Sequence, residues 1–292
     1  MLSIVITTYN RAQPLQRLLK HLENQTSSNF EVVVAMDGST DETQNILLSA
    51  RTSYALNWVN TNYTGYGLSI ARNMGILAAS GDTVVILDDD SFPEPDFVAA
   101  HLSAQCPGVM TCGPRYPADP ESNTQLAVKM ERLKQVVPLN PEPISTLLAV
   151  YPGLSLVENN LSMSREDWIS LGLFTERLKL YGVVGQEFFA RARHLGAKWQ
   201  FAPAAAIMHD SGLEGDNGLD RGRKTRQTRL AQVLRPALMT PRQYQVQIDW
   251  AETRAQGRDI PVPNYPASGW VMAPAYFGRR LLSDAKRKWK CK

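Results

Sequence analysis

The chain has 292 residues, of which 43% are hydrophobic and 20% are charged. This composition excludes a fibrous or disordered protein, and the length suffices for one large domain or two small ones. The 31 basic and 28 acidic residues almost cancel, so the overall charge gives no reason to expect nucleic acid as a partner. Residues 275–292 differ, because they hold seven basic residues and one acidic residue, a net charge of +6 against −3 for residues 1–274.

The cysteines and the first residues bear on the compartment. Cys106, Cys112 and Cys291 form no CxxC pair, so we expect a reducing compartment and not a disulfide framework. The apolar run after Met1 has no basic segment before it and predicts a first strand, not a signal peptide. No stretch approaches the ~20 apolar residues of a spanning helix. We expect a cytoplasmic protein, with peripheral attachment to the inner face of the membrane as the alternative.

Strand and helix patterns alternate through the first part of the chain. Apolar runs predict five strands, at 2–10, 30–37, 56–60, 82–88 and 108–113. Helical spacing predicts helices at 12–25, from the turn at 38–43 to about 51, at 67–79 and from about 95. This order predicts an α/β fold with a mostly parallel, doubly wound sheet, in which the first strand is central.

The later part of the chain is less regular. Residues 114–150 are rich in proline and predict an insertion over the sheet edge, with one helix near 124–136. Further predicted elements are a strand at 159–164, helices at 165–171 and near 185–195, a strand at 198–208, and helices at 219–234, 241–256 and 268–290. We therefore expect a main domain over 1–215 and a helical C-terminal extension over 216–292 that ends in the basic tail.

Acidic residues follow two of the predicted strands. Asp37 ends one apolar run, and Asp88, Asp89 and Asp90 end another. Ligands bind at the carboxyl ends of the strands in an open parallel sheet, and a run of carboxylates there is costly unless a cation neutralises it. Two residues apart in an extended segment, Asp88 and Asp90 are expected to point the same way and to hold Mg²⁺ or Mn²⁺ through oxygen ligands. That ion would in turn hold a diphosphate.

Six blocks of sequence resemble, in their order and spacing, the motifs of family 2 glycosyltransferases with the GT-A fold. They are SIVITTYNR (3–11), MDGSTDET (36–43), GLSIARNMGI (67–76), VVILDDDS (84–91), ENNLSMSRE…GLFTERL (158–178) and GQEFFARARHLG (185–196). The resemblance covers roughly residues 1–210. It implies a GT-A catalytic domain that moves a sugar from a nucleotide-diphosphate sugar to a saccharide or lipid-linked saccharide hydroxyl, with inversion at the anomeric carbon, in glycan or glycolipid biosynthesis.

The resemblance also implies a donor pocket. It assigns Thr7, Tyr9 and Asp37 to the nucleotide base and its ribose, with Arg11 beside them. For Asp37 the alternative is a carboxylate that caps its own GSTD turn, and for Thr7 and Tyr9 it is an ordinary polar strand end. An arginine-rich stretch, 219–227, matches the segment that closes over the nucleotide in such enzymes, and a solvated helix face is its alternative.

A second set of residues is expected around the diphosphate and the metal. The resemblance places Arg72 near the diphosphate, and the alternative is a helix-surface arginine paired with an acid. Asp88 and Asp89 are expected to contact the donor, and Asp88 and Asp90 to ligate the metal. His209 follows a predicted strand and is a candidate third ligand through its imidazole, with a structural histidine as the alternative.

The catalytic base departs from the pattern of the family. Its members usually carry an acidic pair at the start of the helix that here reads VVGQEFFARAR, and Val184 and Gly185 occupy the corresponding positions. Glu187 is the single acid of that segment, and we expect it to take the proton of the acceptor hydroxyl. Asp210 is the second candidate.

Two other functions remain open from the sequence alone. A sugar-nucleotide nucleotidyltransferase shares this architecture but should carry a glycine-rich loop after the first strand, and TTYNRAQPL has no glycine. A catalytically silent nucleotide or glycan binder would explain the missing acidic pair. A dinucleotide site at Gly65-Tyr66-Gly67 is excluded because Ile70 occupies the third glycine position. The basic tail predicts contact with an anionic membrane, or else a helix packed on the body of the protein.

Overall fold

The computed structural model describes residues 1–118, 142–143, 158–176, 184–185, 188–189, 192 and 195–210. The strands are β1 Leu2–Thr8, β2 Phe30–Met36, β3 Ala55–Asn60, β4 Thr83–Asp88, β5 Ser91–Pro93, β6 Val109–Cys112, β7 Arg115–Pro117, β8 Glu142–Pro143, β9 Leu161–Ser164, β10 Lys198–Phe201 and β11 Ile207–His209. The helices are α1 Ala12–His21, α2 Thr43–Ser49, α3 Leu68–Ala78, α4 Phe97–Ala104 and α7 Arg165–Ser170, with a 3₁₀ turn η1 Leu22–Asn24.

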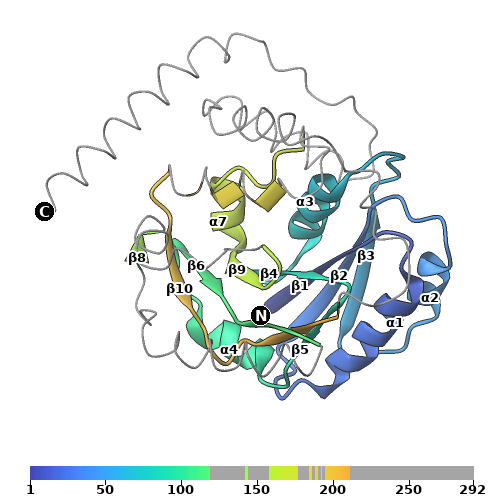
Figure 1. Cartoon of the computed structure of the whole chain (residues 1–292), viewed down its shortest axis with the longest axis horizontal. Coiled ribbons are helices and arrows are strands. Elements are labelled where there is room, and N and C mark those ends of the chain that lie inside the picture. The colour runs from blue at the N-terminus through green and yellow to red at the C-terminus, as the bar shows by residue number, and fades with distance from the viewer. Residues whose placement is uncertain are drawn as a thin grey trace, which may run out of the picture.

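An eight-stranded sheet lies at the centre of the described part, in the order β3-β2-β1-β4-β9-β6-β10-β8 (Figure 1). β1 pairs in parallel with β2 on one side and with β4 on the other. β9 runs antiparallel to both of its neighbours, β4 and β6. The predicted α/β fold with a mostly parallel sheet and an interior first strand is therefore confirmed.

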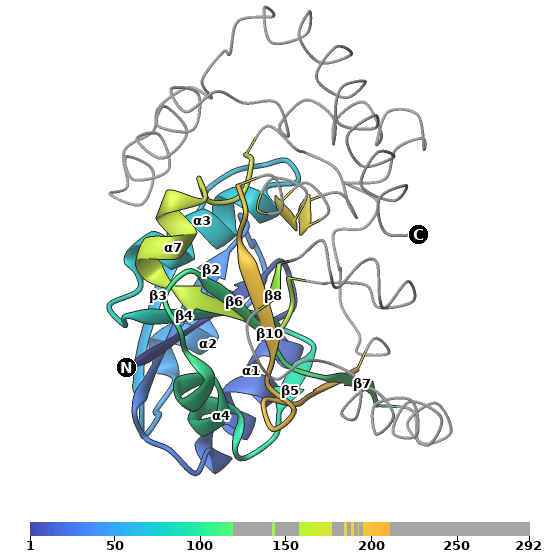
Figure 2. The same cartoon turned by 90° about the vertical axis from the view of Figure 1, so that its left-hand side faces the viewer.

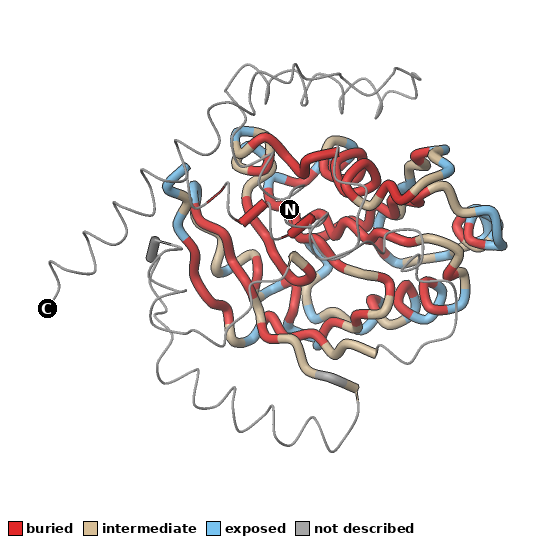
Figure 3. Tube along the Cα trace, turned by 45° about the horizontal axis from the view of Figure 1, so that its top comes forward, coloured by how far each residue is buried: buried red, intermediate tan, exposed pale blue. Residues whose placement is uncertain are grey.

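The sheet is covered by helices on both faces (Figures 1 and 2). On β1, Val5 belongs to the hydrophobic cluster that includes Ile76 of α3 and Trp168 of α7. Ile4 belongs to the opposite cluster, which contains residues of α1, α2 and α4 such as Leu15. The central strands β1, β2 and β4 are buried along almost all of their length (Figure 3), whereas β3 at the edge of the sheet is not. Burial on both faces explains why the sequences of β1, β2 and β4 are continuously apolar and not alternating.

The prediction of one continuous strand at 198–208 is wrong, because the segment forms two strands that belong to two sheets. β10 pairs with β6 and β8 in the large sheet, whereas β11 pairs with β5 and β7 in a second, three-stranded sheet. Between them the N–H of Ala205 donates to the carbonyl of Ala202 (3.0 Å) in a turn. Pro203 lies in this turn, and its missing N–H and fixed φ make it unsuited to a ladder of hydrogen bonds.

The extended geometry predicted for Asp88–Asp90 is also wrong. β4 ends at Asp88, and Asp89 and Asp90 form a turn that leads to β5. The turn is needed because β5 pairs with β11 and so leaves the large sheet. Asp89 and Asp90 consequently both reach Arg11, and the three aspartates do not alternate along a strand.

Several predicted elements differ in length or lie outside the described residues. α1 is shorter than the helix predicted at 12–25, because η1 replaces its last turn, and α2 ends at Ser49. The helices predicted at 124–136, 219–234, 241–256 and 268–290 lie outside the described residues, and of the helix near 185–195 only parts are described. Among the helices that the structure describes, none has the length and apolar character needed to cross a membrane.

Candidate functional site

The predicted site residues that the structure describes gather at the carboxyl edge of the parallel strands. The chain passes from β1 to β2 and β3 on one side and then returns to β4 on the other side of β1. The strand order therefore reverses at β1, and the carboxyl ends of β1 and β4 border the position where open α/β sheets bind ligands. Thr7 at the end of β1 is buried and lies in register with Asp88 at the end of β4.

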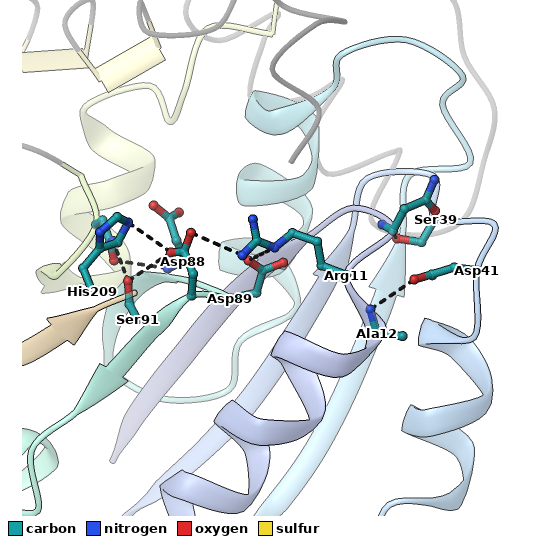
Figure 4. A network of polar contacts seen from close by, with 11 residues as sticks. Arg11, Ala12, Ser39, Asp41, Asp88, Asp89, Ser91 and His209 are labelled. Carbon is teal, nitrogen blue, oxygen red and sulfur yellow. Dashed lines mark hydrogen bonds and ion pairs between the residues drawn. The ribbon is translucent and has the colours of Figure 1, made fainter. Parts of the chain in front are cut away.

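The loops after β1 and β2 are locked together. The N–H of Asn10 donates to Ser39 Oγ (3.1 Å), and the N–H of Thr40 donates to Asn10 Oδ1 (2.7 Å). The N–H of Ala12, at the start of α1, donates to Asp41 Oδ2 (3.0 Å; Figure 4). Three hydrogen bonds thus fix the loop that carries Tyr9 and Arg11.

Asp37 follows β2 and is only 4% exposed. Its Oδ2 accepts a hydrogen bond from the N–H of Gly67 (2.9 Å), the residue before α3. A Cβ at position 67 would overlap Asp37 Oδ1, so only glycine allows this close approach. Within the GSTD turn, Asp41 Oδ1 accepts a hydrogen bond from the N–H of Thr43 (3.1 Å).

A row of charged side chains crosses the carboxyl edge from α1 to β11, as Figure 4 shows. Arg11 Nε lies 3.1 Å from Asp89 Oδ1, and Arg11 Nη2 lies 3.5 Å from Asp90 Oδ2. His209 Nε2 lies 3.3 Å from the other oxygen of Asp90. The N–H of Asp210 also donates to the backbone carbonyl of Asp90 (2.9 Å). Arg11, Asp90, His209 and Asp210, which come from three distant parts of the sequence, are therefore neighbours.

The three aspartates have different electrostatic surroundings. Burial raises the pKa of Asp89 to about 7, against the opposing effects of Arg11 and a hydrogen bond from Thr8. Burial also raises the pKa of Asp88, with Arg72 opposing and the nearby charge of Asp90 adding to the rise. For Asp90, burial is outweighed by the hydrogen bond of His209 and the charge of Arg11, so its pKa is lowered. The raised pKa values of Asp88 and Asp89 show that Arg72 and Arg11 do not fully compensate the cost of burying these charges.

Arg72 joins the carboxylates of two neighbouring strand ends. Its Nη1 donates to Glu158 Oε1 (2.6 Å), and its Nη2 donates to Asp88 Oδ1 (3.1 Å). Its guanidinium also lies 5.2 Å from the centre of the Phe174 ring. The side chain is 2% exposed, so Arg72 is not the helix-surface arginine of the alternative, although the pairing with an acid is correct. Its α3 position is buried because this helix covers the sheet.

Glu158 and the asparagine that follows it were not predicted as site residues from the sequence. Asn159 Oδ1 accepts from the N–H of Asp88 (3.1 Å), and Asn159 Nδ2 donates to Ser91 Oγ (2.7 Å). Glu158 therefore lies beside the end of β4, at the start of the antiparallel strand β9. The segment ENNLSMS could have pointed to these residues, because three polar residues precede a buried strand. The sequence alone does not show which edge of the sheet the three residues reach.

Asn160 and His101 hold the backbone next to Glu158 and Asn159, a corner of the site just before β9. Asn160 has a φ of 76°, and its Nδ2 donates to the backbone carbonyls of Ala205 (2.7 Å) and Pro114 (3.2 Å). Its Oδ1 lies 2.8 Å from His101 Nε2, and His101 Nδ1 lies 2.8 Å from Ser162 Oγ. His101 is fully buried, which lowers its pKa to about 4. The ring is therefore neutral at pH 7, with Nε2 as donor and Nδ1 as acceptor.

A second missed asparagine holds the segment after α7. Asn73 Nδ2 donates to the carbonyl of Phe174 and to Glu176 Oε1, both at 2.8 Å, and its Oδ1 accepts from the N–H of Phe174 (2.8 Å). Asn73 and Arg72 are consecutive on α3. Asn73 thus fixes the segment around Phe174, and Arg72 fixes the carboxylates of Glu158 and Asp88.

The predicted ligands of a divalent metal are Asp88, Asp90 and His209. In the part of the chain that the structure describes, no three His, Cys, Asp or Glu side chains are grouped as a complete metal site. Asp88 is 34% exposed and has one oxygen on Arg72, whereas both oxygens of Asp90 are engaged by Arg11 and His209. One or two carboxylates that share an ion with substrate phosphates are the usual arrangement for Mg²⁺. Asp88 has its second oxygen for that arrangement, whereas Asp90 would have to exchange a contact with Arg11 or His209 for the ion.

Two predicted features lie outside the described residues, namely Glu187 and the arginine-rich stretch at 219–227. Tyr9 is half-buried just after β1. The structure thus brings Arg11, Arg72 and the aspartates after β4 together with His209 and Asp210. It places Asp37 one strand further along the same edge.

Residues 3–149, half of the chain, match the family model described as "Glycosyl transferase family 2". The chain belongs to this family. The match covers β1 to β8 and therefore the segments that carry Arg11, Asp37, Arg72 and the three aspartates.

The similarity of this family 2 chain to named proteins extends over different lengths. It is 37% identical over 127 residues to validoxylamine A glucosyltransferase of Streptomyces hygroscopicus subsp. jinggangensis, which is 42% of this chain and 30% of that protein. It is 29% identical over 247 residues to chondroitin synthase of Escherichia coli, which is 75% of this chain and 36% of that protein. The chain thus spans about a third of the length of these curated relatives.

The fold of the family 2 chain is also similar to that of a solved structure. The crystal structure of GalNAc-T7 with UDP, GalNAc and Mn²⁺ matches it with a TM-score of 0.60 at 16% sequence identity, over 93% of this chain and 53% of the other. At this identity the likeness shows the fold alone. The GT-A fold predicted from the sequence is therefore confirmed.

Proposed function

We propose that the protein is an inverting glycosyltransferase, a hexosyltransferase that moves a sugar from a nucleotide-diphosphate sugar to an acceptor hydroxyl in glycan or glycolipid biosynthesis. The observation that carries this proposal is the row Arg11–Asp89–Asp90–His209 at the carboxyl edge between β1 and β4. It is a set of partly neutralised carboxylates at the ligand-binding edge of a family 2 chain.

The donor is proposed to lie along this edge. Its base and ribose would contact Thr7, Tyr9 and Asp37, with Arg11 beside them, and its diphosphate would lie near Asp88 and Asp89. The buried Asp37 supports this, because its loop is fixed by Gly67 and its carboxylate is a strong acceptor for ribose or base groups. The solved GalNAc-T7 structure with UDP supports a nucleoside diphosphate of this type.

A divalent ion, Mg²⁺ or Mn²⁺, is proposed to be held by Asp88 and Asp90, with His209 as a further contact. When bound, such an ion stabilises the departing diphosphate as a Lewis acid. The chain's own residues prepare this position. Arg11 holds Asp89 and Asp90 from one side, and Arg72 holds Asp88 from the other.

The chemistry is a single in-line displacement. The acceptor oxygen bonds to the anomeric carbon on the face opposite the diphosphate, and the bond to the diphosphate breaks with its electron pair. A carboxylate must take the proton of the acceptor hydroxyl. Glu187 and Asp210 are the candidates from the sequence, and of the two the structure describes Asp210, whose backbone binds Asp90.

The proposal is tested by incubating the full chain with a panel of nucleotide sugars, a saccharide acceptor and Mg²⁺ or Mn²⁺, and measuring products by mass spectrometry. Release of the nucleoside diphosphate together with a product one sugar heavier supports the transferase. Consumption of a nucleoside triphosphate and a sugar phosphate, with release of pyrophosphate, would instead show a nucleotidyltransferase. Binding of uridine diphosphate without turnover of any sugar nucleotide would show a silent binder.

The acceptor is proposed to be a lipid-linked saccharide, reached from an anionic membrane surface. The sequence supports this through the seven basic residues of 275–292, which follow the apolar and aromatic residues 270–277. Each basic residue near an anionic leaflet contributes about 1 kcal/mol of attraction. Co-sedimentation with vesicles of increasing anionic lipid content tests it, with a chain truncated after Pro274 as the comparison. If both chains stay in the supernatant at low salt, a soluble saccharide is the acceptor.

A further inference from the structure

We propose that Glu158 is the catalytic base, and that its carboxylate takes the place of the acidic side chain missing at position 185. This inference rests on the proposed glycosyltransferase function. It differs from the sequence prediction, which assigned the proton transfer to Glu187 or Asp210.

The first observation is the contact between Glu158 and Gly185. A Cβ added at Gly185 would overlap Oε2 of Glu158 and would lie 2.5 Å from its Cδ and 3.0 Å from its Oε1. The carboxylate of Glu158 therefore fills the space into which a side chain at 185 would project. A glycine at 185 and a glutamate at 158 are complementary, because neither a larger residue at 185 nor a second carboxylate would fit beside the first.

The second observation is how the carboxylate is held. Oε1 accepts a hydrogen bond from Arg72 Nη1 at 2.6 Å, and Arg72 is itself anchored by Asp88 at 3.1 Å. Oε2 lies on the Gly185 side, and the side chain is 19% exposed. One oxygen is thus fixed by a buried cation, and among the described residues the other oxygen makes no hydrogen bond, so its lone pairs can accept one. A positioned general base needs this combination of fixed orientation and access.

The third observation is the place of Glu158 relative to the proposed diphosphate site. The next residue, Asn159, accepts a hydrogen bond from the backbone of Asp88 (3.1 Å), and Arg72 links the carboxylates of Glu158 and Asp88 directly. Asn160, tied to His101, fixes the backbone of the same corner. Glu158 is therefore held next to the end of β4, beside the position proposed for the diphosphate.

The proposed step is balanced without a further reactant. The acceptor O–H bond breaks and its proton passes to Glu158 Oε2, while the acceptor oxygen bonds to the anomeric carbon. The bond between that carbon and the diphosphate breaks, and its electron pair stays on the diphosphate. Glu158 then releases the proton to solvent, which restores the carboxylate.

The first test is Glu158→Gln, measured by transfer from a uridine diphosphate sugar that the wild-type protein uses. The amide keeps an oxygen for Arg72 but cannot take the proton. We expect kcat to fall by ~10²–10⁴, with the affinity for uridine diphosphate within about twofold of wild type. Glu166→Gln is the matched control, because Glu166 is an exposed glutamate of α7. It should leave kcat unchanged.

The second test moves the carboxylate from one position to the other. Gly185→Asp alone should lose activity, because its side chain overlaps Glu158, and Glu158→Gly alone should lose turnover. The double variant Glu158→Gly with Gly185→Asp should recover at least tenfold in kcat over Glu158→Gly. If Glu158 only supports Arg72, Glu158→Gln should instead lower donor affinity and thermal stability as much as it lowers turnover.

The outcomes separate this inference from the proposed function. If the wild-type chain turns over no sugar nucleotide, the proposed function and this inference fail together. If the wild type is active and Glu158→Gln keeps its kcat within about threefold, only the assignment of Glu158 is overturned. Loss of kcat with retained donor affinity, together with recovery in the double variant, supports it.

Discussion

The buried imidazole of His101 makes a quantitative prediction about stability. His101 has no exposed surface and lies between Asn160 and Ser162, with which it makes two hydrogen bonds of 2.8 Å. Because Asn160 follows Glu158 and Asn159, these hydrogen bonds support the corner that carries part of the site. Lowering the pH should protonate the imidazole, remove its acceptor at Nδ1 and weaken this corner.

The size of the effect follows from the difference in pKa between the two states. Burial lowers the pKa of His101 from 6.5 to about 4 in the folded protein. Between these values the unfolded chain binds more protons than the folded one, so the free energy of unfolding decreases as the pH falls. The stabilisation is complete above pH 6.5 and is lost as the pH falls toward 4. At about 1.4 kcal/mol for each pKa unit, the full loss is about 3 kcal/mol, and about 2 kcal/mol is lost by pH 5.

The assay is urea unfolding followed by tryptophan fluorescence between pH 7.5 and 5, for the wild type and for His101→Gln. Glutamine can donate to Asn160 and accept from Ser162 without titrating, so the difference between the two proteins isolates the imidazole. The wild type should lose about 2 kcal/mol more than His101→Gln over this range. Parallel curves for the two proteins would show that His101 does not titrate as its burial requires.

Three further predictions concern the site itself. Asp90→Ala should abolish metal-dependent transfer with an unchanged circular dichroism spectrum, because Asp90 lies between Arg11 and His209; full activity in excess chelator would contradict a metal at this position. Asp37→Asn should weaken uridine diphosphate binding at least tenfold in calorimetry while keeping the hydrogen bond from Gly67, and an unchanged affinity would restrict Asp37 to holding its loop. Arg72→Met should lower the free energy of unfolding by about 3 kcal/mol, because Asp88 and Glu158 lose their shared buried cation; a melting temperature equal to that of wild type would refute it.

The central strands could be predicted from the sequence because burial alone determines their pattern. Ile4 and Val5 face opposite helical layers and are both fully buried, so the run that contains them is apolar throughout. The acidic residues after β2 and β4 could also be placed, because the end of a parallel strand defines the edge on which its next side chains lie.

The rest of the site depends on contacts between distant segments. Glu158 and Arg72 are 86 residues apart, and His101 and Asn160 are 59 residues apart. No local sequence pattern identifies such pairs, because each of these polar residues, judged from its neighbours in the sequence, could equally be exposed to solvent. The turn at Asp89 and Asp90 was missed for the same reason, because it is imposed by the pairing of β5 with β11 and not by the aspartates.

The reversed direction of β9 has a consequence for how the site can vary. A parallel strand brings its last residue to the carboxyl edge, whereas β9 brings its first, so Glu158 and Asn159 enter the site before the strand begins. The N–H of Ala118, just after β7, donates to the carbonyl of His209 at the same edge (2.9 Å). The chain therefore leaves this edge after 118 and returns to it at 158. A change at 158 or 159 can therefore alter the chemistry of this edge without changing the paired residues of β9, which begin at Leu161.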